Sequence, residues 1–246
     1  MSHRSGRVEA IDTLAVLSDN LRRRIYFFVR ESEGAASRQE VAKELGISVK
    51  LAAFHLDKLV DAGLLKAHYA RPPERSGPGA GRSAKYYDPA DIELEVSVPE
   101  RHYDLAGELL LQALRSRSSD EPAVEAANRV ALERGTTLGE EIRQGLRGGR
   151  IGPERAMAVA EEVLSEHGYE PYRPSPTEIR MRNCPFHRLA RYDTDLVCGM
   201  NHAFISGFIR SLGNESIGVA LEPSPDECCV TLREQKQSRT GSEKEE

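Results

Sequence analysis

Two short helical patterns, joined at a glycine, stand out between residues 37 and 65. Ser37 and Glu40 have the spacing of a capping box, which predicts where the first of these helices begins. Gly46 supplies the tight turn at its end, and Ser48 is placed to cap a second helix. Two capped helices joined by such a short turn are the helix-turn-helix pattern.

The second of these helices has an apolar face and an outer face of mixed character. Ala52, Leu56 and Leu59 recur at helical spacing and are predicted to point inward. The outer face is small and weakly charged near the helix start, as an approach to base edges in the major groove requires. Many helical hairpins with a glycine turn bind no nucleic acid. We favour DNA binding here because a strand and a basic, glycine-rich segment follow the helix.

That following segment has the pattern of a wing, which is a strand, a basic loop and a second strand. Residues 64–69 and 86–87 have extended patterns, and residues 71–84 between them are rich in proline and glycine. The basic side chains of the loop suit contact with phosphates or the minor groove, whereas the alternative is an ordinary solvated loop. The candidate DNA-contacting residues are Ser37, Ser48, Val49, Lys50, Ala53, Phe54, Lys58, Arg71, Arg75, Arg82 and Lys85.

Four further helical patterns flank this region. Residues 9–31 are predicted to form a single helix, preceded by disordered residues 1–8. Residues 101–116, 121–146 and 153–168 have amphipathic patterns separated by glycine and proline. The middle of the chain is therefore expected to be helical.

The last part of the chain has a mixed helix and strand pattern. Three prolines between residues 171 and 176 predict a connector. Strands are predicted at residues 178–182, 216–221 and 228–233, and a helix that ends at Leu212 lies between the first two. The sequence thus predicts a small α+β module near the end of the chain.

Charge and composition narrow the class of protein. Residues 1–90 hold 15 Lys and Arg against 11 Asp and Glu, whereas the remainder holds 19 against 28. A basic first third with an acidic body suits a DNA-binding regulator. No run approaches a membrane span and no signal peptide is evident, so we expect a cytoplasmic protein with reduced thiols. No phosphate loop, Ser-His-Asp arrangement or paired-carboxylate motif is evident, so we expect no enzyme activity.

All four cysteines lie in the last quarter of the chain, between residues 184 and 229. Cys184 and His187 have a C-x-x-H spacing at a strand exit, where two side chains can converge. Cys198 falls in the first turn of a predicted helix, where the helix dipole favours a thiolate. Cys228 and Cys229 are predicted to begin a strand and therefore to point to opposite sides, with Cys228 inward. Only one of this pair is then expected to join a common site.

Three thiolates and one further ligand can hold an iron–sulfur cluster or a tetrahedral zinc ion. The cysteine spacing matches neither a compact ferredoxin run nor a paired C-x-x-C zinc ribbon. Two other interpretations stay open: a thiol redox switch without metal, and cysteines that only fill a core.

Two parts of the chain resemble known bacterial regulators. Residues 9–90 resemble the winged-helix domain of ArsR-like transcription regulators in the pieces LSDNLRRRIYFFV, LGIS-x6-HLDKLVDAGLL and GRSAKYY. The chain departs from that family at Asp19-Asn20, where a proline is usual. The C-terminal half resembles the SufR-type branch in the motif NCPFH…LVCGMNHAFISGFIRSLG…ECCV. Members of that branch are repressors that sense an iron–sulfur cluster and control the genes that build such clusters.

The SufR-type resemblance implies a ligand set for the cluster. Cys184, Cys198 and one of Cys228 or Cys229 match the cluster cysteines of that branch, and a [4Fe-4S] or [2Fe-2S] cluster is implied. The fourth ligand stays open, with His187 as the first choice, and the second cysteine of the pair or His202 behind it. The resemblance also implies a homodimer on a two-fold double-stranded DNA operator. A helix placed at 101–116 in such a regulator usually joins the two chains, and burial in its own domain is the alternative.

The sequence as a whole predicts a mainly α protein with small β elements, in the α+β class. We expect a winged helix-turn-helix at 9–92, a helical dimerisation or linker region at 99–169, a cysteine-rich sensor module at 170–234 and a disordered tail at 235–246. The predicted function is a DNA-binding repressor controlled by an iron–sulfur cluster. The alternatives are a regulator with structural zinc or a thiol switch, and one whose helical middle binds a small apolar effector.

Overall fold

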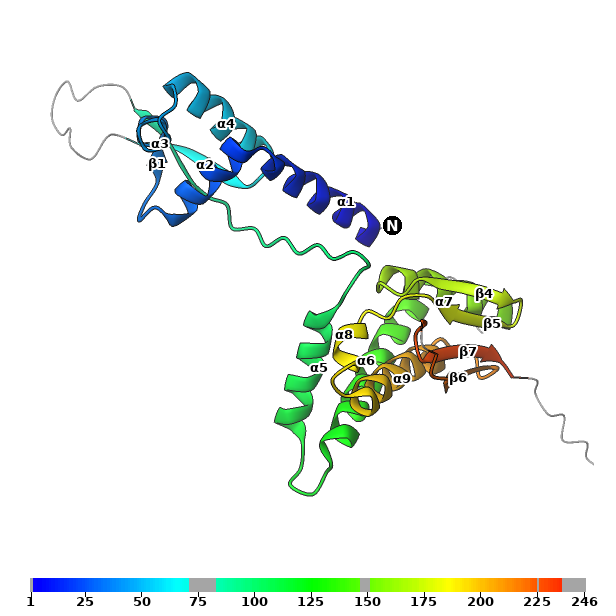
Figure 1. The fold of residues 1–246 in the computed structure, drawn as a ribbon. Coiled ribbons are helices and arrows are strands. Elements are labelled where there is room, and N and C mark those ends of the chain that lie inside the picture. Colours follow the sequence, from blue (N-terminus) through cyan, green and yellow to red (C-terminus); the bar gives the residue numbers. More distant parts are fainter. Residues whose placement is uncertain (1, 71–82, 147–150, 225, 236–246) are drawn as a thin grey trace, which may run out of the picture. The chain divides into compact units, whose positions relative to one another are not determined.

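A computed structural model describes residues 2–70, 83–146, 151–224 and 226–235 (Figure 1). The chain divides into two compact units, Met1–Val96 and Ser97–Glu246, which are described separately. Both are mainly helical with a small antiparallel sheet, which confirms the predicted α+β class. Within the described ranges, no helix is long and apolar enough to cross a membrane.

The first unit is a set of helices beside a three-stranded sheet of order β1-β3-β2. Its core is apolar and centres on Ile25, Leu56, Leu59 and Tyr87, which are almost fully buried. Its elements are α1 (Ser2–Ala15), the 3-10 turn η1 (Val16–Ser18), α2 (Asn20–Glu31), β1 (Ala36–Ser37), α3 (Arg38–Leu45), α4 (Val49–Asp61), β2 (Leu65–Ala70) and β3 (Ala84–Pro89).

The single helix predicted over residues 9–31 is wrong, because the chain breaks between α1 and α2. Asp19 has an extended backbone, and its carboxylate accepts a hydrogen bond from the Arg22 N–H at 2.8 Å, so it caps α2. The helix before the break begins at Ser2, where disorder was predicted. Apolar periodicity continues across the break, so periodicity alone did not reveal it.

The helix-turn-helix caps form as the sequence predicts. The Ser37 hydroxyl accepts from the Glu40 N–H at 3.3 Å, and the Glu40 carboxylate accepts from the Ser37 N–H at 2.7 Å. Gly46 adopts a left-handed backbone with φ 65°, which ends α3. The Ser48 hydroxyl then accepts from the Leu51 N–H at 3.2 Å and starts α4. Local hydrogen bonds therefore fix both helix starts and the turn.

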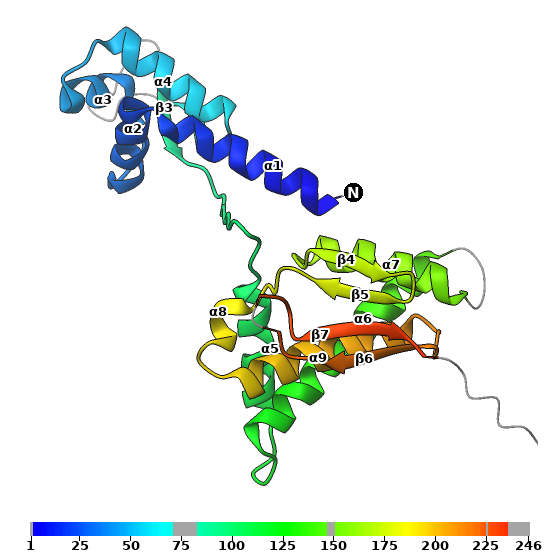
Figure 2. The same cartoon turned by 45° about the vertical axis from the view of Figure 1, so that its right-hand side comes forward.

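The second unit packs helices against a four-stranded antiparallel sheet of order β4-β5-β7-β6 (Figure 2). Helix α9 lies against α6 on one side and against β6 and β7 on the other. Its elements are α5 (Tyr103–Ser116), α6 (Ala123–Gly145), α7 (Pro153–Glu166), β4 (Pro171–Ser175), β5 (Glu178–Met181), α8 (His187–Ala190), α9 (Thr194–Ser211), β6 (Ile217–Leu221) and β7 (Val230–Glu234).

One hydrophobic core runs through this unit. It contains Val130 and Leu164 from the region expected to be helical, and Phe208 and Val230 from the cysteine-bearing region. The ranges 99–169 and 170–234 therefore fold around shared buried residues. Of the predicted tail at 235–246, residues 236–246 lie outside the described part of the chain.

Two predictions near the cysteines need correction. The proline-rich stretch is the strand β4 and not a connector. β4 is an edge of the described sheet, where the missing proline N–H removes no ladder bond. The last strand begins at Val230, so Cys228 and Cys229 precede it. The alternation of side chains along a strand therefore does not fix the directions of these two side chains.

Candidate nucleic-acid interface and cysteine site

The outer face of α4 is the candidate nucleic-acid interface. Val49, Lys50, Phe54 and Lys58 are exposed on it, and the Phe54 side chain is 55% exposed. Ala53 lies among them half-buried, so the centre of this face is small. An exposed face with two lysines, a small centre and an apolar ring can contact phosphates and base edges together.

Buried residues on the opposite face hold α4 in place. Ala52, Leu56 and Leu59 are fully buried, which confirms the predicted inward face. His55 is also buried, and sequence reasoning missed it. The sequence did hold a signal of this burial, because His55 lies three residues after Ala52 and so on the same side of the helix. Because α4 is anchored along its length, its outer face has a fixed orientation within the first unit.

Besides Ser48, which caps α4, Ser37 and Lys85 among the candidate DNA-contacting residues have structural partners. The Ser37 side chain is buried in the cap of α3. The Lys85 ammonium on β3 donates to the Asp57 carboxylate of α4 at 2.6 Å, and this hydrogen bond raises the pKa of Lys85. The Tyr87 hydroxyl donates to the same carboxylate at 3.2 Å. These contacts tie the second wing strand to α4.

The wing strands pair in register, with Ala67 opposite Tyr87. Tyr69 near the end of β2 is 70% exposed, and sequence reasoning did not include it in the interface. Of the basic candidates in the wing, Arg71, Arg75 and Arg82 lie outside the described residues. Tyr69 is therefore an exposed aromatic side chain on the first wing strand, close to the segment predicted to be the wing loop.

The four cysteine thiols of the second unit come together in two pairs. The Sγ atoms of Cys198 and Cys229 are 2.9 Å apart. The Cys228 thiol donates a hydrogen bond to Cys184, which packs against the same core. Both members of the 228–229 pair therefore contact another thiol, Cys229 that of Cys198 and Cys228 that of Cys184.

The electrostatics of the pairs differ from the sequence expectation. The hydrogen bond from Cys228 lowers the pKa of Cys184, with the nearby Arg101 guanidinium acting in the same direction. Burial and the neighbouring Cys229 raise the pKa of Cys198 to about 12, so the helix dipole does not make it a thiolate. The pKa of Cys228 lies well above its ordinary value because of Cys184 and burial. Cys184 is the thiol most readily ionised of these three.

A buried relay of hydrogen bonds orients Cys228. The Tyr169 hydroxyl donates to the Asn201 Oδ1 at 2.5 Å, which turns the Asn201 amide nitrogen toward Cys228. That nitrogen donates to the Cys228 Sγ at 3.3 Å, and all three residues are buried. Burial also raises the pKa of Tyr169 well above its ordinary value, which keeps it a donor. Sequence reasoning missed Asn201. The signal that could have revealed it is an amide side chain at a position on the apolar face of a predicted helix.

A second set of contacts fixes the segment that carries Cys184. The Arg101 guanidinium donates to the Cys184 carbonyl at 2.9 Å and also to the Asn183 side chain. The Asn183 amide donates to the carbonyls of Gly168 at 2.6 Å and Glu100 at 3.0 Å. Residues from three separate parts of the chain therefore position one cysteine.

The two candidate histidine ligands have other surroundings. His187 is exposed at the start of α8, and its backbone N–H donates to the Cys184 carbonyl at 3.0 Å. The His202 Nε2 donates to the Val219 carbonyl at 3.2 Å. Of the two histidine candidates for a fourth ligand, His187 is thus exposed and His202 is hydrogen-bonded to β6.

The donor set has the chemistry of a soft-metal site, although the thiols are not preformed around an ion. In the described residues, no group of three or more His, Cys, Asp or Glu side chains has the arrangement of a metal site. Tetrahedral Zn–S bonds place two sulfurs about 3.8 Å apart, so Cys198 and Cys229 must separate for a metal to bind both. Four thiols are a donor set that suits zinc or an iron–sulfur cluster.

Comparison with known proteins identifies the first unit. Residues 17–67 match the family model of the helix-turn-helix domain. This segment is a helix-turn-helix domain. It runs from η1 into β2 and includes the whole outer face of α4, which is the DNA-binding surface in regulators of this type. No curated protein matches the chain.

Proposed function

We propose that this protein is a transcription regulator that binds double-stranded DNA through α4 and responds to a signal at its four cysteines. The exposed outer face of α4 in a helix-turn-helix domain is the observation that carries DNA binding. Lys50 and Phe54 would contact base edges, and Lys58 would contact phosphate. The resemblance to ArsR-like and SufR-type regulators supports the same function, as a repressor and not as an enzyme.

An iron–sulfur cluster is the cofactor that we propose for the cysteine site. Cys184, Cys198, Cys228 and Cys229 would hold it, because their thiols meet in two pairs while His187 is exposed. Four cysteines are the ligand set of both [2Fe-2S] and [4Fe-4S] clusters, and either supplies a redox- and iron-responsive group. Asn201 would donate its N–H to one ligand sulfur, and Arg101 would hold the segment of another.

The protein would act as a homodimer on a two-fold operator. Two α4 helices must lie about one DNA turn apart, roughly 34–36 Å, to engage both half-sites. Helix α5 is the candidate dimer element, since its Leu111 and Leu114 side chains are 63% and 66% exposed. A change in dimer geometry would then link the cysteine site to operator affinity. Sedimentation of the wild type and of a Leu111→Glu, Leu114→Glu variant tests this assignment.

The first experiment is an absorption spectrum with iron, sulfide and zinc analysis on protein purified without oxygen. Brown protein with acid-labile sulfide supports the cluster, and colourless protein after reconstitution contradicts it. Operator affinity is then measured at one salt concentration before and after cluster removal, because salt alone changes the affinity. An unchanged affinity would exclude the sensor role and leave DNA binding intact.

A zinc site or a thiol switch is the second candidate, favoured by the 2.9 Å contact between the Cys198 and Cys229 sulfurs. Zinc would use the same four thiolates. In a switch, Cys198 and Cys229 would form a disulfide, and the two electrons and two protons released would reduce a peroxide to water and an alcohol or a second water. Stoichiometric zinc without sulfide distinguishes the first case, and loss of two titratable thiols with peroxide distinguishes the second.

A further inference from the structure

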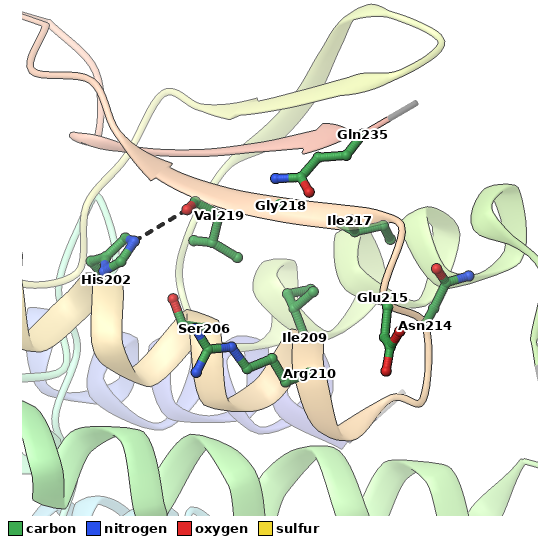
Figure 3. A pocket seen from close by; sticks show the side chains of 10 residues that line it. All are labelled: His202, Ser206, Ile209, Arg210, Asn214, Glu215, Ile217, Gly218, Val219 and Gln235. Atoms are coloured by element: carbon green, nitrogen blue, oxygen red, sulfur yellow. Dashed lines mark hydrogen bonds between the residues drawn. The ribbon is translucent and has the colours of Figure 1, made fainter. Parts of the chain in front are cut away.

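A polar pocket opens between α9 and β6 in the second unit (Figure 3). Its volume is about 520 Å³, which lies within the range of small-molecule sites. The side chains that matter most are His202, Ser206 and Arg210 from α9, Glu215 from the turn after it, and Gln235 after β7. All of them lie outside the cysteine pairs.

The pocket follows one polar stripe along α9. His202, Ser206 and Arg210 recur every four residues, so they lie on neighbouring positions of one helix side, and all three line the pocket. Ile209, which also lines the pocket, is buried and apolar. The stripe therefore places polar groups where α9 meets β6, at a boundary that hydrophobic residues would otherwise fill.

Several polar groups in the pocket have no partner among the residues that the structure describes. In the part of the chain that the structure describes, Arg210 and Glu215 form no ion pair, with each other or elsewhere. The side chains of Ser206 and Gln235 likewise have no hydrogen bond among the described residues. The nearby Asn214 differs, because it donates to the Ile151 carbonyl and accepts from Ser216.

These groups present both charges to one small space. Arg210 offers the planar fork that matches a carboxylate, and the Ser206 hydroxyl lies one turn earlier on the same face. Glu215 offers a carboxylate, which matches an ammonium group. The helix dipole favours a cation in the last turn of α9, which accounts for the position of Arg210. The dipole does not account for the presence of Glu215 and Ser206 in the pocket.

We propose that this pocket binds a small zwitterion of the amino-acid class. Its carboxylate would lie on Arg210 and Ser206, and its ammonium group would lie on Glu215. The Gln235 amide would donate to or accept from the side chain of the ligand. His202 closes one end of the pocket, because its Nε2 donates to the Val219 carbonyl of β6 at 3.2 Å. This site is independent of the function proposed for the cysteines.

Calorimetric titration of the full-length chain with individual L-amino acids tests the proposal. Succinate and putrescine serve as probes that carry only one kind of charge. At least one amino acid is expected to bind with a Kd of about 1 mM or tighter, and Arg210→Ala and Glu215→Ala are each expected to weaken it at least about tenfold. The matched controls are Arg191→Ala on the chain after α8 and Glu140→Ala on α6, both at exposed positions that do not line the pocket.

Three outcomes would overturn the proposal. The first is that no L-amino acid gives binding heat at concentrations up to about 10 mM. The second is that binding survives both Arg210→Ala and Glu215→Ala. The third is that succinate or putrescine binds as tightly as the best amino acid, since a single charge would then suffice. Thermal unfolding of each variant without ligand verifies that Arg210→Ala and Glu215→Ala fold.

Discussion

Gly207 on α9 packs directly against the backbone carbonyl of Leu132 on α6. A Cβ built on Gly207 would lie 2.2 Å from the Leu132 oxygen, a separation that real Cβ atoms do not adopt. The approach is matched on the other helix, where a Cβ on Gly135 would lie 1.9 Å from the Phe204 oxygen. The two central helices of the second unit thus meet backbone to backbone.

Gly207→Ala is expected to destabilise the second unit by roughly 3 kcal/mol, since overpacking against backbone atoms cannot be relieved by a rotamer change. Denaturant unfolding measures the effect. Gly107→Ala on α5 is the matched control, because a Cβ there meets nothing within 4 Å. The control is expected to gain stability of about 1 kcal/mol from helix propensity. Equal effects of the two substitutions would contradict the close contact.

Asn201→Ala is expected to destabilise the second unit by about 1–3 kcal/mol, because it leaves the buried Tyr169 hydroxyl without an acceptor. Tyr169→Phe removes the donor instead and leaves the Asn201 amide without its orienting bond. If the relay is real, the double variant loses less stability than the sum of the two single variants, as a double-mutant cycle in denaturant measures. Additive losses would show that the two side chains act separately.

The first unit is expected to lose stability as the pH rises through about 10 and above. The pKa of Lys85 is raised by its bond to Asp57, and that of Tyr87 is raised by burial and the same carboxylate. Both groups hold their protons more tightly when folded, so their contribution is full below the ordinary pKa and is lost above it.

Unfolding of the wild type between pH 8 and pH 11 measures this dependence, with the pH steps set by the ordinary lysine and tyrosine pKa values of about 10. Asp57→Asn removes the shared carboxylate and is expected to flatten the curve. A steep loss in Asp57→Asn equal to that of the wild type would contradict the role of this carboxylate.

Lys50→Ala and Phe54→Ala are each expected to weaken specific DNA binding by about 1–3 kcal/mol, because their side chains would contact base edges. Lys58→Ala is expected to weaken specific and non-specific binding alike and to reduce the salt dependence. Fluorescence anisotropy over a range of salt concentrations measures both. Arg191→Ala in the second unit is the control, and a similar loss in that variant would argue against a surface on α4.

Serine substitution at any one of Cys184, Cys198, Cys228 and Cys229 is expected to lower the bound iron and sulfide, whereas His187→Ala is expected to retain them. The reason is that His187 lies exposed, outside the thiol pairs. Iron and sulfide analysis after anaerobic reconstitution measures the difference. Loss of the cluster in His187→Ala, with retention in Cys229→Ser, would restore the ligand set that the sequence first favoured.

The sequence by itself determined the helix-turn-helix. Its defining contacts join residues a few positions apart: Ser37 with Glu40, and Ser48 with Leu51. Caps and a left-handed glycine turn depend on local backbone hydrogen bonds, so residue type and spacing predict them. The inward face of α4 followed from helical periodicity for the same reason. The break at Asp19 also has a local cause, but the apolar period concealed it.

Only the tertiary structure decided which cysteine thiols meet. Cys198 and Cys229 are 31 residues apart in the chain and meet because α9 and the segment before β7 pack on one core. The Asn201 relay to Cys228 depends on the same packing. Contacts between such distant positions leave no periodic pattern in the sequence. The reason is that their geometry depends on how closely α6, α9 and the sheet approach one another.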